Sequence, residues 1–238
     1  MQNQVEMRNK HIEFLKSLDT EEFYNKNEDE VRRYAHDSLQ ELMQLGTEVT
    51  HELLGLLETE FTWSCFFALA VLRQIKDPQA VPALVAFLTK ESDDSMANEE
   101  AMFALQDIGD FSIVPLIEVL ETQFNEKKYN SYLIGALTGI IGPASYEFMI
   151  KITKDFINKP SDYKGWFHIE DFTYNFPKQQ RKDALPYLKQ ILEMKTVSGE
   201  EKREIHDTIR ALEDPEGYEK EIEETANEIT AATEQETT

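Results

Sequence analysis

Few residues in the chain combine types and spacings that could do chemistry. The five histidines are His11, His36, His51, His168 and His206. None of them forms an H-E-x-x-H or H-x-x-x-H pair, so a zinc site of the metalloprotease kind is not expected. His168 is followed by Glu170 and Asp171 in the aromatic stretch 163–177. Three polar groups beside an aromatic wall could serve a small ligand or a reaction, whereas the helical spacing of Trp166 and Ile169 favours an ordinary core helix.

The remaining sequence offers no set of residues that could catalyse a reaction together. It has no glycine-rich phosphate loop, no G-x-S-x-G turn and no C-x-x-C pair. Cys65 is the single cysteine, and its neighbours Phe66, Phe67 and Ala68 indicate a buried core position. Carboxylates are too numerous for a catalytic pair to be chosen. We therefore expect a protein that is not an enzyme and that needs neither a metal nor a cofactor.

Charge is the strongest compositional feature. The chain has 46 acidic and 24 basic residues, a formal net charge of −22. Such a surface repels phosphate backbones and anionic lipids, and the sequence contains no basic cluster that would offset this repulsion. We therefore expect no nucleic-acid partner and no membrane partner. A large negative charge also serves solubility alone.

The hydropathy of the chain predicts where in the cell the protein is located. No apolar run approaches the roughly 18 residues that a membrane span needs. The first residues, MQNQVEMRNKHIEFLKSL, contain no continuous apolar segment of the signal-peptide kind. The expected compartment is the cytoplasm.

One sequence pattern occurs twice and organises the chain. CFFALAVLRQIKDPQAVPALVAFL (65–88) is followed by NEEAMFALQDIGDFSIVPLIEVL (98–120) at a constant offset of 33 residues. A period of about 20 to 50 residues is typical of stacked repeat proteins. Each copy is predicted to be an apolar helix, an Asp turn and a second helix. Asp77 and Asp110 should accept hydrogen bonds from the second helices, and Pro82 and Pro115 should lie near their first turns.

Looser copies flank this pair. Helical periodicity predicts a helix over 31–45, ended by Gly46, and another pair of helices between about Tyr129 and Phe156. We expect one domain over 1–238, with its clearest repeats at 61–157 and degenerate repeats at 31–60 and 163–232. Residues 232–238 should form a mobile tail.

The segments ALAVLRQIKDPQAVPALVAFL and AMFALQDIGDFSIVPLIEVL resemble the HEAT-repeat family, in particular its short bacterial, phycobilisome-lyase-type repeats. The resemblance covers 61–157 well and the flanks by analogy. It implies an all-α, α-α superhelix (a HEAT-like solenoid) of about five to six helix pairs, with a concave face that usually binds another protein. Phe111 departs from the pattern, because a Pro often follows the turn Asp. The motif residues are structural, so no catalytic residue carries over, and nothing in the chain supports a bilin-lyase role.

The two clear repeats allow a binding surface to be sketched. In the second helices Val81, Leu84 and Phe87 should face the core, as should Val114, Ile117 and Leu120. The residues left facing away, and expected to line the concave face, are Val85, Ala86, Thr89, Glu118, Val119 and Thr122. Such a mixed apolar and acidic strip suits a partner helix or a basic protein surface, and the alternative is a merely solvated face.

A second candidate surface is the aromatic segment, whose residues are Tyr163, Trp166, Phe167, His168, Glu170 and Tyr174. Trp and Tyr often anchor interfaces, although large aromatics in helices usually pack inward. Three functions follow. The chain is expected to be a non-enzymatic scaffold that binds a partner protein. One alternative is an acidic neutraliser of a basic partner, such as an immunity protein against a nuclease toxin or a nucleic-acid mimic. The other is a small-ligand protein or enzyme that uses 163–177. The oligomeric state stays open.

Overall fold

The computed structural model describes residues 2–58, 62–90 and 95–236. Within these ranges every regular element is an α-helix or a short 3-10 helix and no strand occurs, which confirms the predicted all-α class. None of the helices in these ranges is long and apolar enough to cross a membrane. The chain divides into two compact units, Met1–Gln123 with Asn130–Ile140, and Phe124–Tyr129 with Ile141–Thr238. A single domain over 1–238, wound as one solenoid, stays a prediction.

The first unit begins with a group of helices that precedes the clear repeats. These elements are α1 Gln2–Ser17, α2 Glu21–Tyr24, α3 Glu28–Leu45, η1 Gly46–Val49, α4 Thr50–Gly55 and η2 Leu56–Glu58. Asn27 caps α3 by accepting a hydrogen bond from the Glu30 N–H. Gly46 ends the helix with a φ of +61°, as predicted for a residue that reaches the left-handed region without strain. Helix α1 packs on both α3 and α5, and α3 also contacts α5.

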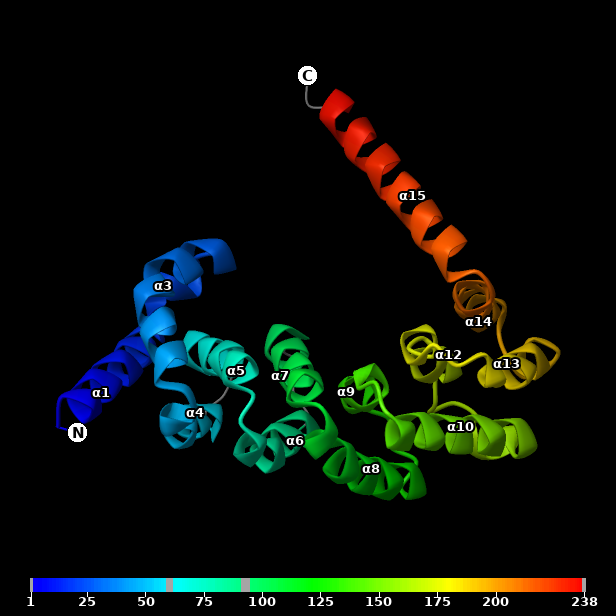
Figure 1. Ribbon diagram of the computed structural model, residues 1–238, viewed down its shortest axis with the longest axis horizontal. Helices are drawn as coiled ribbons and strands as arrows, with labels where there is room; N and C mark the ends of the chain where they lie inside the picture. Colours follow the sequence, from blue (N-terminus) through cyan, green and yellow to red (C-terminus); the bar gives the residue numbers. More distant parts are fainter. Residues whose placement is uncertain (1, 59–61, 91–94, 237–238) are drawn as a thin grey trace. The chain divides into compact units, whose positions relative to one another are not determined.

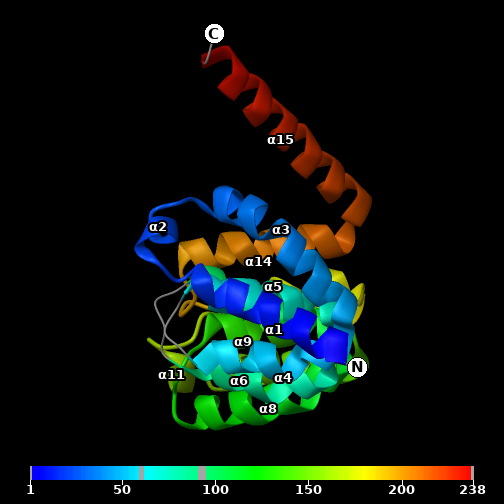
Figure 2. The same cartoon turned by 90° about the vertical axis from the view of Figure 1, so that its left-hand side faces the viewer.

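The clear repeats follow in the same unit. Their elements are α5 Trp63–Ile75, η3 Pro78–Ala80, α6 Val81–Thr89, α7 Ser95–Ile108, α8 Asp110–Asn125 and α9 Ser131–Gly139. Helices α5, α7 and α9 form one layer of this unit, and α4, α6 and α8 form the other (Figures 1 and 2). Helix α7 lies at the centre, because it contacts α5, α6 and α9.

Equivalent positions of the first helices support the offset of 33 residues. Leu72 on α5 and Leu105 on α7 are both fully buried. Each helix then ends at a residue in the left-handed region, Lys76 with φ of +56° and Gly109 with φ of +76°. The two copies of the sequence pattern therefore have the same structure from the first helix to the residue that ends it.

Beyond the turn the two copies differ. Asp77 is buried, and its Oδ1 accepts a hydrogen bond from the Gln79 N–H at 3.0 Å, as predicted. Pro82 lies in the first turn of α6, also as predicted. The same expectations are wrong for the second copy. Helix α8 already starts at Asp110, so Pro115 lies inside the helix rather than at its start. Phe111 stands where the first copy has Pro78, and without that Pro the chain forms no separate 3-10 turn.

The second unit contains shorter and less regular helices. Its elements are α10 Pro143–Asn158, α11 Pro160–Tyr163, α12 Ile169–Thr173, η4 Pro177–Gln179, η5 Lys182–Ala184, α13 Leu185–Leu192, α14 Gly199–Glu213 and α15 Pro215–Glu236. Helix α10 packs on α11, α12 and α13, and α14 packs on α12, α13 and α15. Helix α14 has a capping box, in which Ser198 and Glu201 each accept a backbone hydrogen bond from the other residue.

The last helix is longer than the sequence suggested. Helix α15 continues as far as Glu236, which overlaps the tail expected at 232–238. The mobility of that tail stays a prediction, and residues 237–238 lie outside the described residues. From Pro215 to Asn227 every side chain is exposed except that of Tyr218, which is half-buried. Helix α15 therefore contributes little to the core over this stretch.

Candidate functional site

The polar residues of the stretch 163–177 meet Tyr129. The Tyr129 hydroxyl donates a hydrogen bond to the Asp171 carboxylate, 42 residues further along the chain. His168 Nδ1 lies 3.4 Å from Glu170 Oε1, and the His168 and Tyr129 rings are 5.1 Å apart. The structure therefore brings His168, Glu170 and Asp171 close to Tyr129. Tyr129 was missed, because nothing in the local sequence links it to a segment so far away.

The electrostatics of this cluster favour a structural role. Burial, with the hydrogen bond to Asp171, raises the pKa of Tyr129, so the phenol stays protonated and keeps donating. Burial also raises the pKa of Glu170, and Glu201 and Asp171 act in the same direction, whereas the backbone N–H of Glu170 and nearby His168 oppose them. A raised carboxyl pKa is common in active sites, but there it faces a cavity. Here Oε2 of Glu170 is enclosed by protein.

Metal ligation gains no support either. In the ranges 2–58, 62–90 and 95–236, no group of three or more His, Cys, Asp or Glu side chains could hold a metal ion. Cys65 is buried in α5, at the core position that its neighbours predicted.

The aromatic residues of 163–177 divide into core and surface. Tyr163 and Phe167 are buried, Trp166 is half-buried, and Tyr174 is 65% exposed. The rings whose centres lie within 6.2 Å of that of Phe167 belong to Phe124, Tyr129, Phe156, Tyr163, Trp166 and Phe172. Phe167 therefore occupies the centre of an aromatic core, and Tyr174 is the member of the candidate set that offers a free ring face.

The single helix expected from Trp166 to Phe176 does not form. Only α12, Ile169–Thr173, is helical in the middle of this stretch, and residues 164–168 make an irregular connection. Gly165 adopts a φ of +83°, a left-handed conformation that interrupts a right-handed helix. The connection folds Phe167 inward, although a continuous helix would have turned it away from the face that carries Trp166.

The six residues predicted to line the concave face differ in exposure. Ala86, Thr89, Glu118 and Thr122 are exposed, and Val119 is half-buried. The hydroxyls of Thr89 and Thr122 donate to the carbonyls four residues earlier, those of Val85 and Glu118. Val85 is only 5% exposed, so the expectation that it points away from the core is wrong.

Burial on α8 is shifted relative to α6. Ile113, Leu116 and Leu120 on α8 are buried where Val81, Leu84 and Leu88 are buried on α6, one residue earlier than an offset of 33 predicts. The shift follows from the earlier start of α8, because one residue turns a helix by about 100°.

This shift exposes apolar residues that the sequence pattern placed in the core. Val114, expected to face inward, is 62% exposed, and Phe111 is 67% exposed. Positions 111, 114, 118 and 122 are three or four residues apart, so they form one stripe along the helix. We call Phe111, Val114, Glu118, Glu121 and Thr122 the α8 face. Phe111 at the position of a turn Pro was the one sequence signal that could have revealed it.

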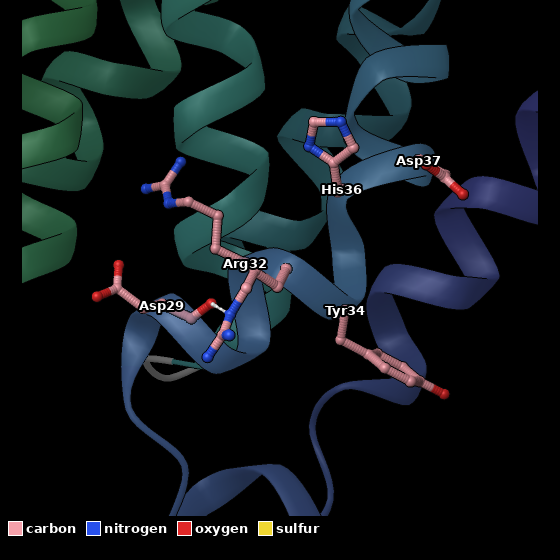
Figure 3. A pocket seen from close by; sticks show the side chains of 6 residues that line it. Asp29, Arg32, Tyr34, His36 and Asp37 are labelled. Carbon is pink, nitrogen blue, oxygen red and sulfur yellow. Dashed lines mark hydrogen bonds between the residues drawn. The ribbon is translucent and has the colours of Figure 1, made fainter.

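A separate hollow lies on α3 in the first unit (Figure 3). It has a volume of about 810 Å³ and is lined by Asp29, Arg32, Arg33, Tyr34, His36 and Asp37. Tyr34 and His36 point away from each other in this view. Arg32 is already engaged with the Glu28 carboxylate at 2.6 Å and lies over the ring of Phe67 at 5.9 Å. The Tyr34 ring also packs near those of Phe14 and Phe23, so two of the six lining side chains are already engaged within the protein.

A more enclosed groove lies in the second unit, between the segment 174–182, helix α14 and the start of α15. Its volume is about 760 Å³. Exposed Tyr174 and half-buried Tyr218 contribute to its lining, and Ala211 and Leu212 provide apolar surface. Sequence analysis singled out Tyr174 but not the groove, which depends on the packing of α14 against α15. We call it the α14–α15 groove.

The fold defines the protein as an all-α protein of paired, repeating helices over the residues that the structure describes. A comparison with known protein families shows which kind of repeat this is. Residues 66–90 match the family model for the PBS lyase HEAT-like repeat, which identifies α5, η3 and α6 as a HEAT-like repeat. Searches of curated proteins and of solved structures found no match.

Proposed function

We propose that this protein is a non-enzymatic scaffold that binds another protein through the α8 face and the neighbouring exposed residues of α6. The observation that carries this proposal is the pair Phe111 and Val114, which lie three residues apart and are more than 60% exposed. Single exposed apolar side chains are ordinary on protein surfaces. Two adjacent ones on a helix that also carries buried Ile113 and Leu116 are less so, because α8 already has a complete core-facing side.

The composition of the face supports a particular kind of partner. Glu118 and Glu121 continue the stripe that starts with Phe111 and Val114, and the whole chain carries a net charge of −22. An apolar anchor beside carboxylates suits a partner helix or surface that combines apolar and basic side chains. The acidic charge would speed encounter with such a partner and reject acidic ones.

HEAT-like repeats are generally interaction modules, which agrees with this proposal. A more specific form of the proposal is an acidic neutraliser of a basic partner, such as an immunity protein against a nuclease toxin or a nucleic-acid mimic. The name of the matching family includes a lyase, and the proposal does not carry that activity over, because the matched residues form the turn and the packed helices of the repeat. The proposal includes the position of the α8 face on the concave side of a solenoid.

Affinity capture from the source cell tests the proposal. The wild-type chain and the charge-reversal variant Glu118→Lys/Glu121→Lys would be immobilised, washed at low and then at high salt, and the retained proteins identified by mass spectrometry. We expect a basic partner that the wild type retains at low salt and the variant does not. Salt should weaken the complex, because the Debye length falls from about 10 Å at 0.1 M to about 3 Å at 1 M.

A control variant separates the local effect from total charge. Glu193→Lys/Glu223→Lys makes the same change of charge at exposed positions that do not belong to α8. Retention of the partner by this control and loss by the α8 variant would support the proposal. Equal retention by both variants would count against the α8 face.

A further inference from the structure

The α14–α15 groove lies outside the α8 face and has its own chemistry. Three segments contribute to it, the stretch from Tyr174 to Lys182, the second half of α14 and the first turns of α15. Its volume of about 760 Å³ is within the range of about 300 to 1,000 Å³ typical of ligand sites. Ala211 and Leu212, which are almost fully buried, form an apolar part of its floor at the edge of α14.

Aromatic and acidic groups already hold one cation beside the groove. The Arg210 guanidinium lies 5.7 Å from the centre of the Tyr218 ring. It also contacts Asp207 at 3.5 Å and donates to the Glu221 carboxylate. A ring face with carboxylates on either side is a favourable place for a guanidinium or ammonium group. Burial, with nearby Asp207 and Tyr174, raises the pKa of Tyr218, so that the ring stays a neutral phenol.

The groove itself offers similar groups, an exposed ring and several carboxylates, with fewer cations than carboxylates. Tyr174 exposes 65% of its surface. Glu204, Glu216 and Glu219 line the groove, and no ion pair engages them in the ranges that the structure describes. The lining contains five carboxylates, two of which belong to Asp207 and Asp214, and two lysines. Negative charge therefore prevails around an accessible aromatic ring.

The lysines do not close the groove to a cation. Lys182 Nζ donates a hydrogen bond to the Glu213 carbonyl at 3.1 Å, which directs its charge to the end of α14. Lys178 is exposed and can turn toward water. We propose that the α14–α15 groove binds a basic peptide segment of a partner protein, with an Arg or Lys side chain on the Tyr174 ring between Glu204 and Glu219. An apolar neighbour of that residue would lie on Ala211 and Leu212.

This proposal does not depend on the α8 face. A probe set tests it directly, an array of fluorescein-labelled hexapeptides that share apolar residues and carry Arg, Lys, Gln or Glu at one fixed position. Fluorescence anisotropy measures their affinity for the full chain. We expect the best Arg or Lys peptide to bind at least about fivefold more tightly than its Gln counterpart, since the Gln peptide lacks both the cation–π contact with the Tyr174 ring and the attraction to the Glu204 and Glu219 carboxylates.

Variants locate the binding to the groove. Tyr174→Ala and Glu204→Gln/Glu219→Gln should each weaken binding of that peptide at least about fivefold, whereas Tyr174→Phe keeps the ring and should stay within about twofold. The control Glu193→Gln/Glu223→Gln removes the same charge elsewhere and should also stay within about twofold. Circular dichroism on each variant checks that the helices are intact.

Three results would overturn the proposal. The first is equal binding of Gln and Arg peptides, which would exclude recognition of a cation. The second is an equal loss in the control and in Glu204→Gln/Glu219→Gln, which would reduce the effect to total charge. The third is full binding by a folded Tyr174→Ala variant, which would place the peptide elsewhere.

Discussion

Replacing Asp77 by Ala should destabilise the protein far more than the same change at Asp110, although the repeat pattern makes the two residues equivalent. Asp77 is 3% exposed and uses both carboxylate oxygens. Oδ1 accepts from the Gln79 N–H at 3.0 Å, and Oδ2 accepts from the Thr50 hydroxyl at 2.7 Å. Asp110 is exposed and begins α8 itself.

The magnitudes follow from these contacts. Loss of a helix cap costs about 0.5 to 2 kcal/mol, and loss of a hydrogen bond to a charged group costs about 1.5 to 3 kcal/mol. Because the two effects share one side chain, we expect Asp77→Ala to lower the free energy of unfolding by about 2 to 4 kcal/mol. Asp110→Ala removes only a charge in the first turn of a helix, an effect of about 0.3 to 1 kcal/mol.

Urea unfolding followed by circular dichroism measures both changes. A double-mutant cycle with Thr50→Val isolates the hydrogen bond that joins α4 to the turn, and we expect Asp77 and Thr50 to be coupled by more than about 0.5 kcal/mol. Equal losses for Asp77→Ala and Asp110→Ala, or no coupling to Thr50, would refute the reasoning that the two turns differ.

Three further predictions concern stability. Leu105→Ala, which truncates a fully buried side chain, should lower the free energy of unfolding by about 2 to 5 kcal/mol, and a loss below about 1 kcal/mol would show that α7 is misplaced. Gly109→Ala should cost about 1 kcal/mol in urea unfolding, because φ is +76° there, whereas Gly55→Ala at a helical, exposed glycine should not destabilise. The folded-state pKa of Glu170 is raised, so its ionisation opposes folding as the pH rises above the carboxyl range. Glu170→Gln should therefore raise the melting temperature at pH 7.5 and have a smaller effect near pH 4, and the opposite trend would contradict the burial of this carboxyl.

The sequence predicted the helices of the repeat because local chemistry determines them. Gly46 ends α3, Asp77 caps the turn before α6, and Pro82 lies in the first helical turn, each for a reason that involves only near neighbours. The buried positions of α5 and α7 follow equally from apolar spacing, as Leu72 and Leu105 illustrate.

The candidate binding surface was harder to predict because one residue changes the rotation of a helix. In the alignment of the two repeats Val114 is equivalent to Val81, which is buried. Because Phe111 replaces the Pro of the turn, α8 starts earlier and Val114 points outward. Val85 was misplaced for a related reason. On a helix as apolar as α6, sequence alone does not show which apolar residues are covered by other helices.

The stretch 163–177 shows a third limit. Its polar residues were recognised, but their partner Tyr129 is distant in sequence, and the bend at Gly165 that turns Phe167 inward has no strong periodic signal. The α14–α15 groove is likewise a product of tertiary packing. Tyr174 could be singled out from its residue type, whereas Glu204 and Glu219 could not be separated from the many other carboxylates.

The measurement that most directly tests the central proposal compares partner capture by two apolar variants. Phe111→Ser/Val114→Ser alters the α8 face, and Ile141→Ser removes an equally exposed apolar side chain, 67% exposed, elsewhere. Burying one such side chain in an interface contributes about 1.5 to 3 kcal/mol. We predict that the folded α8 variant retains at least about tenfold less partner than the wild type does, and that Ile141→Ser retains as much as the wild type. Full retention of the same partner by the α8 variant would contradict the account.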